Sequence, residues 1–206
     1  MFVDKMEFTT SSGYLLITQK APLVTLESLK LKKKKPEQMP MDQLVIDELA
    51  GNQQNAIDTL KAYKRSEAAD WIAYQRGAKA DSALYVCCLK DMDIVSFPAV
   101  ADYQFAKDKN ILYYVSKGDT IHTKAGLYTY LPEEKKSQLI YEGKGVFKQI
   151  VYDEKGEKLA FLYCPDKDSV STNFALFVSA NNTTARMIAD QSHSSFPREW
   201  IISEHG

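Results

Sequence analysis

The side chains that most often carry enzymatic chemistry are sparse in this sequence and lie far apart. Serine hydrolases hold their nucleophile in a Gly-x-Ser-x-Gly turn between a strand and a helix, and the 206 residues contain no such motif. The three histidines, His122, His193 and His205, have no second ligand at the spacing that a zinc site on a helix or a hairpin requires. The sequence therefore predicts no catalytic residue and no metal site.

The shorter polar motifs also fall short of known ligand-binding patterns. Asp153-Glu154 and Asp166-Lys167-Asp168 lack the complete calcium loop of an EF-hand. Gly143-Lys144-Gly145 lacks the spacing of a phosphate-binding loop and the helix that should follow it. The run Glu133-Glu134-Lys135-Lys136 is typical of a solvated hairpin. We therefore predict no cofactor-binding residue and no bound cofactor.

The three cysteines do not indicate metal or redox chemistry. Cys87, Cys88 and Cys164 are too few for a disulfide framework. Cys87 and Cys88 are neighbours on one predicted strand, so their side chains point to opposite faces of the sheet. This placement favours small, core-filling side chains.

A basic run follows the strand predicted over residues 14–20. Lys30 and the four residues 32–35 are all lysine, and such clusters can bind phosphate groups. No aromatic side chain that could stack on a base lies within the run, and a formal net charge of −1 gives the chain no overall attraction for nucleic acid or membrane. We expect a solvated loop and no nucleic-acid partner.

Length and hydropathy indicate a globular chain. The 206 residues are 45% hydrophobic, which is enough to bury a core. No stretch of eighteen apolar residues that could span a bilayer occurs, so we expect no membrane partner. The first nineteen residues lack the basic start and apolar centre of a signal peptide, and the compartment is left open.

The sequence predicts mainly β-strands, and the pattern of these strands repeats along the chain. Four segments each combine an aromatic residue, a short polar turn and an apolar strand: 8–18, 63–75, 103–116 and 151–164. Each is followed by a further strand in which a leucine holds the equivalent place: Leu44, Leu84, Leu127 and Leu176. The leucines are spaced by about 40, 43 and 49 residues. The sequence therefore contains a repeat with a period in the forties.

A repeat of this period built from four short strands is the signature of β-propeller blades. A fourth strand is visible near Leu60, Val95, Ile140 and Met187. We predict an all-β fold, a single partial β-propeller domain over 1–206 with about four four-stranded antiparallel units and little helix apart from turns near 66–69. The predicted units are 6–64, 68–97, 100–141 and 146–189, and a further unit begins at 196–206. An irregular antiparallel sandwich is the alternative.

The predicted core consists of the inward-facing apolar residues of these strands. They are Leu16, Ile46, Trp71, Ala73, Leu84, Val86, Tyr103, Phe105, Leu112, Tyr114, Leu127, Ile150, Leu159, Phe161, Leu176 and Phe177. The further unit ends after one strand and shows no polar cap of the kind that closes a repeat array. We therefore expect the chain to be a fragment of a longer protein and its open edges to favour self-association.

Several segments resemble the N-terminal propeller of bacterial prolyl oligopeptidase-family serine peptidases, over nearly the whole chain. They are LKLKKKKPEQMPMDQLVIDEL, DWIAY, YQFAKDKNILYYVS, GVFKQIVYDEKGEKLAFLYC and WIISEHG. The resemblance implies a non-catalytic domain that caps a C-terminal α/β-hydrolase domain and admits only peptides to its serine. It also implies export of the parent protein to the periplasm. Dipeptidyl-peptidase relatives bind the substrate amino terminus through a glutamate pair, but no Glu follows Trp71 in DWIAYQR, so that role is not transferred.

The residues and the resemblance support two candidate functions. The first is a substrate-gating part of such a peptidase, inactive alone, with the hydrolase domain as partner and peptides as the substrates of the parent. The alternative is a stand-alone TolB-like propeller that binds a protein partner through loops such as Lys117–Ala125. An independent hydrolase is disfavoured because the nucleophile motif is absent.

Overall fold

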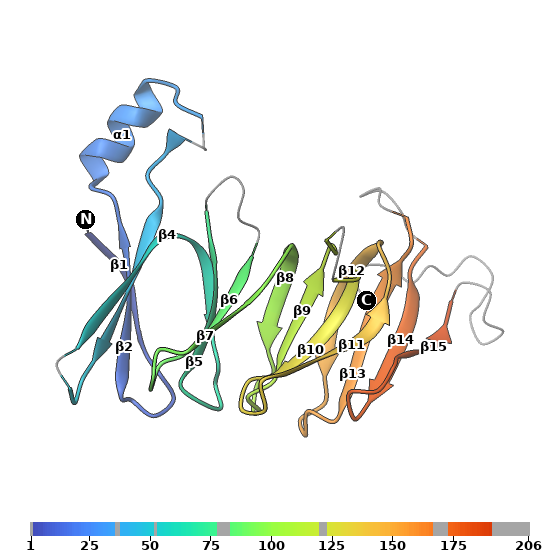
Figure 1. Ribbon diagram of the computed structural model, residues 1–206. Coiled ribbons are helices and arrows are strands. Elements are labelled where there is room, and N and C mark those ends of the chain that lie inside the picture. The colour runs from blue at the N-terminus through green and yellow to red at the C-terminus, as the bar shows by residue number, and fades with distance from the viewer. Residues whose placement is uncertain are drawn as a thin grey trace. The chain divides into compact units, whose positions relative to one another are not determined.

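The computed structural model describes residues 2–35, 38–51, 53–77, 83–119, 123–166 and 173–190 (Figure 1). Regular structure within these ranges is β-strand except for one α-helix and a single 3₁₀ residue. The predicted all-β fold is therefore confirmed. The chain divides into two compact units, an N-terminal unit of Met1–Phe97 and a C-terminal unit of Pro98–Gly206.

The N-terminal unit is one antiparallel sheet whose strands lie in chain order. Its strands are β1 (Phe2–Phe8), β2 (Tyr14–Lys20), β3 (Asp42–Glu48), β4 (Gln54–Arg65), β5 (Trp71–Arg76), β6 (Leu84–Cys88) and β7 (Ile94–Phe97). Short polar turns join most neighbours. In the β4–β5 turn, which the sequence predicted, the Ser66 hydroxyl accepts the backbone N–H groups of Ala68 and Ala69.

The long strand β4 belongs to two blades. Its first half pairs with β3, from Gln54 to Leu60, and its second half pairs with β5, from Leu60 to Arg65. At the junction Thr59 has a φ of +57°, and the β4–β5 register shifts between Leu60 and Ala62. One strand therefore serves as the fourth strand of the first blade and as the first strand of the second blade.

The two blades of the N-terminal unit share an apolar core. Leu16, Leu44, Ile46 and Ile57 from β2, β3 and β4 form one cluster with residues of the second blade. The partners from the second blade are Ile72, Tyr74, Cys87 and Leu89. Burial of each such aliphatic or aromatic side chain stabilises a fold by about 1.5–3 kcal/mol, so this cluster holds the shared sheet together.

The cysteines fill space as the sequence predicted. Cys87 and Cys164 are fully buried, Cys88 is half-buried, and none of the three forms a disulfide. Burial raises the pKa of Cys87 to about 12. Cys87 therefore stays protonated near neutral pH and acts as a small apolar side chain.

The C-terminal unit contains two four-stranded antiparallel sheets. The third blade consists of β8 (Val100–Phe105), β9 (Leu112–Ser116), β10 (Gly126–Leu131) and β11 (Lys136–Glu142). The fourth blade consists of β12 (Val146–Tyr152), β13 (Lys158–Cys164), β14 (Ala175–Ala180) and β15 (Arg186–Ala189). With the two blades that share β4, the described chain has the four four-stranded units that the repeat predicted.

An aromatic core lies between the third and fourth blades. Tyr113, Leu127 and Ile140 of the third blade form a cluster with Phe161 and Phe177 of the fourth. The rings of Phe161 and Phe177 stack with centroids 5.5 Å apart. Stacked aromatic pairs contribute about 0.5–1.5 kcal/mol beyond the area that they bury.

Hydrogen bonds also join the first strands of these two blades. The Gln104 side-chain amide on β8 donates to the Ile150 carbonyl on β12 at 2.7 Å. The Tyr152 hydroxyl on β12 donates to the Phe105 carbonyl on β8 at 3.0 Å. Side chains therefore fix the distance between strands that share no backbone ladder.

The repeated leucines occupy equivalent places in the blades. Leu44, Leu84 and Leu127 lie on β3, β6 and β10, the third strand of each blade, and all three are fully buried. Leu176 lies on the third strand of the fourth blade, β14, and is half-buried. The sequence repeat is therefore a repeat of strand position.

Three residues of the predicted core are only partly buried: Trp71, Ile150 and Leu176. Trp71 is the first residue of β5, at a hairpin end, and Ile150 lies on β12, an edge strand of its sheet. Positions at strand ends and sheet edges keep part of a large side chain in solvent, which alternation along the sequence does not reveal. The other predicted core residues are buried.

A helix, α1 (Leu23–Leu31), follows Pro22 and reaches into the basic run that the sequence predicted as a solvated loop. Leucine, glutamate and lysine favour helix, and proline is well tolerated where a helix starts. No residue of α1 is buried, and residues 32–35 after it are exposed as expected.

None of the described helices has the length and apolar character needed to cross a membrane. The further unit predicted at 196–206 lies outside the described residues.

A carboxylate joins the first strands of the two N-terminal blades. Glu7 on β1 accepts hydrogen bonds from the Tyr63 hydroxyl and, at 3.4 Å, from Arg65 Nε, both on β4. Burial raises the pKa of Glu7, but the hydrogen bonds from Tyr63 and Lys5 and the charges of Lys5 and Arg65 together lower it below the ordinary 4.5.

This lowered pKa predicts acid-sensitive stability. The contribution of Glu7 is present above the unfolded pKa and is lost as the pH falls through the lower folded pKa. We expect Glu7→Gln to reduce the free energy of unfolding by on the order of 1 kcal/mol near pH 7 and by much less at about pH 3. Urea unfolding at both pH values measures this difference. Glu134→Gln, in an exposed turn, is the control, and an equal effect of Glu7→Gln at both pH values would refute the assignment.

Candidate functional site

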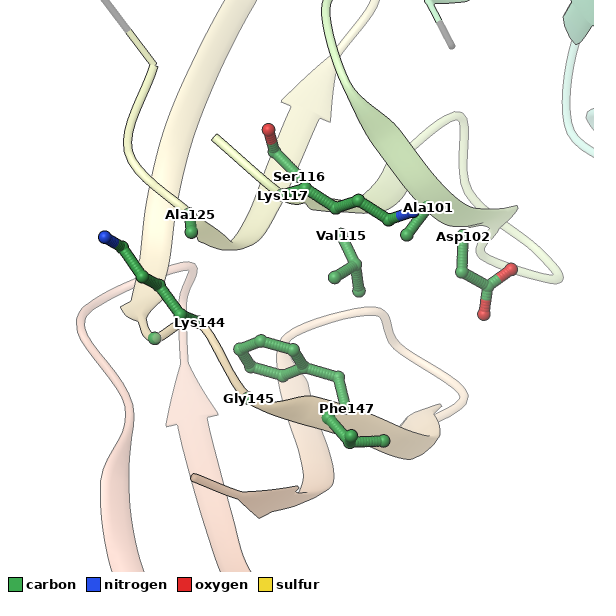
Figure 2. Close-up of a pocket in the computed structure, with 11 residues that line it drawn as sticks. Ala101, Asp102, Val115, Ser116, Lys117, Ala125, Lys144, Gly145 and Phe147 are labelled. Atoms are coloured by element: carbon green, nitrogen blue, oxygen red, sulfur yellow. The ribbon is translucent and has the colours of Figure 1, made fainter. Parts of the chain in front are cut away.

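A pocket of about 410 Å³ opens between the third and fourth blades, within the C-terminal unit (Figure 2). We call it the interblade pocket. Its lining comes from strand ends and from the β11–β12 connection: Ala101, Asp102, Val115, Ser116, Lys117, Ala125, Gly143, Lys144, Gly145, Val146 and Phe147. The volume is within the range of small-molecule sites.

The β11–β12 connection forms one wall, and its glycines allow a close approach of the backbone. A Cβ on Gly145 would lie 1.9 Å from the Cys164 carbonyl oxygen, and a Cβ on Gly143 would lie 2.5 Å from the Tyr163 hydroxyl. The Gly143 N–H donates to the Ala125 carbonyl at 2.9 Å. The two glycines of Gly143-Lys144-Gly145 therefore allow the backbone of this connection to pass directly over the end of β13.

The floor of the pocket is apolar. Val115 on β9 and Phe147 on β12 point toward one another from its two sides (Figure 2). The Phe147 ring is held by other rings, with centroid distances of 4.9 Å to Tyr163 and 5.7 Å to Phe161. The ring is thus fixed in place and presents an apolar surface to the pocket.

The rim carries more positive than negative charge. Lys117 and Lys144 are its cations and Asp102 is its one acidic side chain. The Lys117 side chain extends toward Ala101, and the Lys144 side chain extends on the side of Ala125 (Figure 2). Neither ammonium group has an ion-pair or hydrogen-bond partner within the described ranges.

Ser116 is the one hydroxyl in the lining, and its bonding is structural. Its side chain is buried, donates to the Pro98 carbonyl at 3.4 Å and accepts the Gly118 N–H at 3.1 Å. The three histidines all lie outside the described residues. The described part of the chain therefore places no histidine beside Ser116.

The Asp153 carboxylate of the first acidic motif accepts hydrogen bonds from the backbone of its own turn. Asp153 accepts the backbone N–H groups of Glu157 at 2.7 Å and Lys158 at 2.9 Å, and these hydrogen bonds lower the pKa of its carboxyl group. Gly156, with a φ of +65°, completes this turn. Of Asp166-Lys167-Asp168, Asp166 alone is described. Across the described ranges no three His, Cys, Asp or Glu side chains lie together as a metal site would need.

Sequence patterns did not predict the interblade pocket, because its residues come from four separate segments of the chain. Two signals were nonetheless present. Gly143-Lys144-Gly145 combines two glycines with a cation, and the loop Lys117–Ala125 has both of its end residues in the lining. The structure brings these two sequence features to one place, although residues 120–122 of the loop lie outside the described ranges.

No protein-family model and no curated protein sequence matches the chain. The chain is similar in structure to the β-propeller domain of the trilobed protease from Pyrococcus furiosus, with 91% of the chain covered, a TM-score of 0.54 and 10% identity. It is similar to an acylaminoacyl peptidase from Pyrococcus horikoshii over 92% of its length, with a TM-score of 0.52 and 12% identity. For the tricorn protease these values are 86%, 0.52 and 11%.

The chain spans 57%, 32% and 18% of these three proteins, respectively. Likeness at such low identity concerns the fold and not the activity. This structural likeness and the four four-stranded units together show that the chain has the blade architecture of a partial β-propeller.

Proposed function

We propose that this chain is the substrate-gating propeller portion of a prolyl oligopeptidase-like serine peptidase and that it has no catalytic activity alone. The observation that carries the proposal is the likeness of most of the chain to propeller-containing peptidases. The sequence resemblance to the same group of enzymes points in the same direction. In this function the blades exclude large molecules, and a partner α/β-hydrolase domain supplies the reacting serine.

A size filter must keep its dimensions under thermal motion, and the contacts between blades support this requirement. The bonds of Gln104 and Tyr152 join the third and fourth blades, and the contact of Glu7 with Tyr63 joins the first and second. In both units the bonds connect first strands of neighbouring blades. Folded proteins would be held away from the serine, while flexible peptides would pass.

The non-catalytic part of the proposal is tested with the purified chain. We expect no labelling by a fluorophosphonate, which reacts with activated serines, and no release of p-nitroaniline from peptide anilides. A serine peptidase of known activity is the positive control. Labelling that disappears in the Ser116→Ala variant would show an activated serine and refute this part of the proposal.

A stand-alone binding module is the second candidate. The interblade pocket favours it, because the pocket includes both ends of the loop Lys117–Ala125, which the sequence indicates for partner binding. The two candidates differ in the coding sequence expected downstream of this chain. A peptidase requires a hydrolase domain there, and a stand-alone module does not.

A further inference from the structure

The interblade pocket has a surplus of positive charge that the fold itself does not use. Some of the described lysines are paired, such as Lys124 with Glu142 at 2.6 Å and Lys20 with Asp4 at 2.9 Å. By contrast, the ammonium groups of Lys117 and Lys144 have no partner within the described ranges. Two cations against one carboxylate therefore favour an anionic ligand.

The two lysines are not equivalent. Lys117 extends toward the side of the pocket where Asp102 lies (Figure 2). Lys144 lies on the opposite side, on the turn between two glycines. Its backbone N–H also lacks an acceptor among the described residues. Lys144 thus has two donors, its ammonium and its backbone amide, that the described residues leave without an acceptor.

The apolar floor limits which anion fits. Val115 and Phe147 face each other (Figure 2) in the same lining as Lys144, and the neighbouring rings hold Phe147 in place. A free phosphate or sulfate would leave this surface empty, whereas an acyl amino acid carries an apolar side chain next to its carboxylate. A cavity of about 410 Å³ is large enough for one such residue.

We propose that the interblade pocket binds the carboxylate end of a peptide or N-acyl amino acid. The Lys144 ammonium and backbone amide bind the carboxylate, and the apolar side chain lies against Phe147 and Val115. Lys117 and Asp102 lie at the other end of the pocket, where the ligand continues as neutral peptide. The proposal concerns this chain alone and holds whether or not a hydrolase domain follows it.

The test is a titration of the purified full chain, followed by ¹⁵N–¹H NMR, with N-acetylphenylalanine and with its uncharged amide. We expect the acid to shift the resonances of Val115, Lys144 and Phe147, and the amide to bind about tenfold more weakly because it lacks the charge-assisted hydrogen bonds. In Lys144→Gln the acid should lose about tenfold in affinity while the amide is unchanged.

Two matched variants complete the test. Lys34→Gln removes an exposed lysine of the N-terminal unit and should leave both affinities unchanged. Lys117→Gln should have a smaller effect than Lys144→Gln. Equal affinity of acid and amide, or shifts confined to residues outside the pocket, would overturn the proposal. Because Lys144 is exposed, its variant should fold, so a null result is informative.

Discussion

Replacing Phe161 by alanine is expected to reduce the free energy of unfolding of the C-terminal unit by about 3–5 kcal/mol. Phe161 is 1% exposed and lies in the cluster between the third and fourth blades. Its ring stacks on Phe177 and contacts those of Tyr141 and Phe147. Truncation removes these contacts and leaves a cavity that two hydrogen-bonded sheets cannot fill by moving together.

Urea unfolding monitored by circular dichroism measures this effect. Met187→Ala, at a position 53% exposed on β15 of the same blade, is the control and should change stability by less than about 0.5 kcal/mol. Phe161→Leu keeps part of the volume and should have an intermediate effect if the alanine variant fails to fold. Similar small effects of all three substitutions would mean that the two blades do not share this core.

Substitution of Gly145 by alanine is expected to destabilise the same unit by about 1–3 kcal/mol. The added Cβ would overlap the Cys164 carbonyl oxygen, which is backbone on β13 and cannot rotate away. The β11–β12 connection must therefore move, and with it Lys144 and Phe147. We expect the variant to lose both stability in urea and binding of N-acetylphenylalanine at the interblade pocket.

Gly51→Ala is the matched control for this substitution. A Cβ on Gly51 would approach only the end of the flexible Glu48 side chain, at 2.5 Å, and this side chain can turn away. Replacing a tolerant glycine by alanine also restricts the unfolded chain, which favours the native state slightly. We expect near-neutral behaviour of Gly51→Ala. Equal stability of the two variants would contradict the close approach at Gly145.

The blade pattern was predictable from the sequence because it depends on local alternation and on a repeat. The leucines at 44, 84 and 127 recur with the third strand of each blade, and the structure buries them fully. The leucine positions follow the order of the strands along the chain. Local patterns in the sequence reveal this order without information about contacts between distant residues. The four-stranded units of the C-terminal unit were visible for the same reason.

The sequence did not reveal that two blades share β4, because the sharing depends on the backbone conformation within this strand. Ile57 and Leu60 are buried three residues apart, which breaks the two-residue alternation of a strand. The break coincides with the positive φ of Thr59 and the register shift after Leu60. Threonine gives no sequence sign of this conformation, so the pattern did not show that one strand serves both blades.

The helix and the interblade pocket were missed for different reasons. Helix α1 is short and buries no residue, so it lacks the apolar periodicity by which helices are recognised. The pocket depends on bringing together strand ends that lie more than forty residues apart in the sequence, from Ala101 to Phe147. Only the packing of the two blades brings Lys144, Val115 and Phe147 into the lining of one pocket.

The central claim is that this chain is the gating part of a serine peptidase, and the most direct test is the DNA sequence of its source locus beyond codon 206. We expect an open reading frame, continuous or restored by one frameshift, that encodes a Gly-x-Ser-x-Gly turn between a strand and a helix, then an Asp and a His. A stop codon followed by unrelated sequence would contradict the claim and favour a stand-alone binding module.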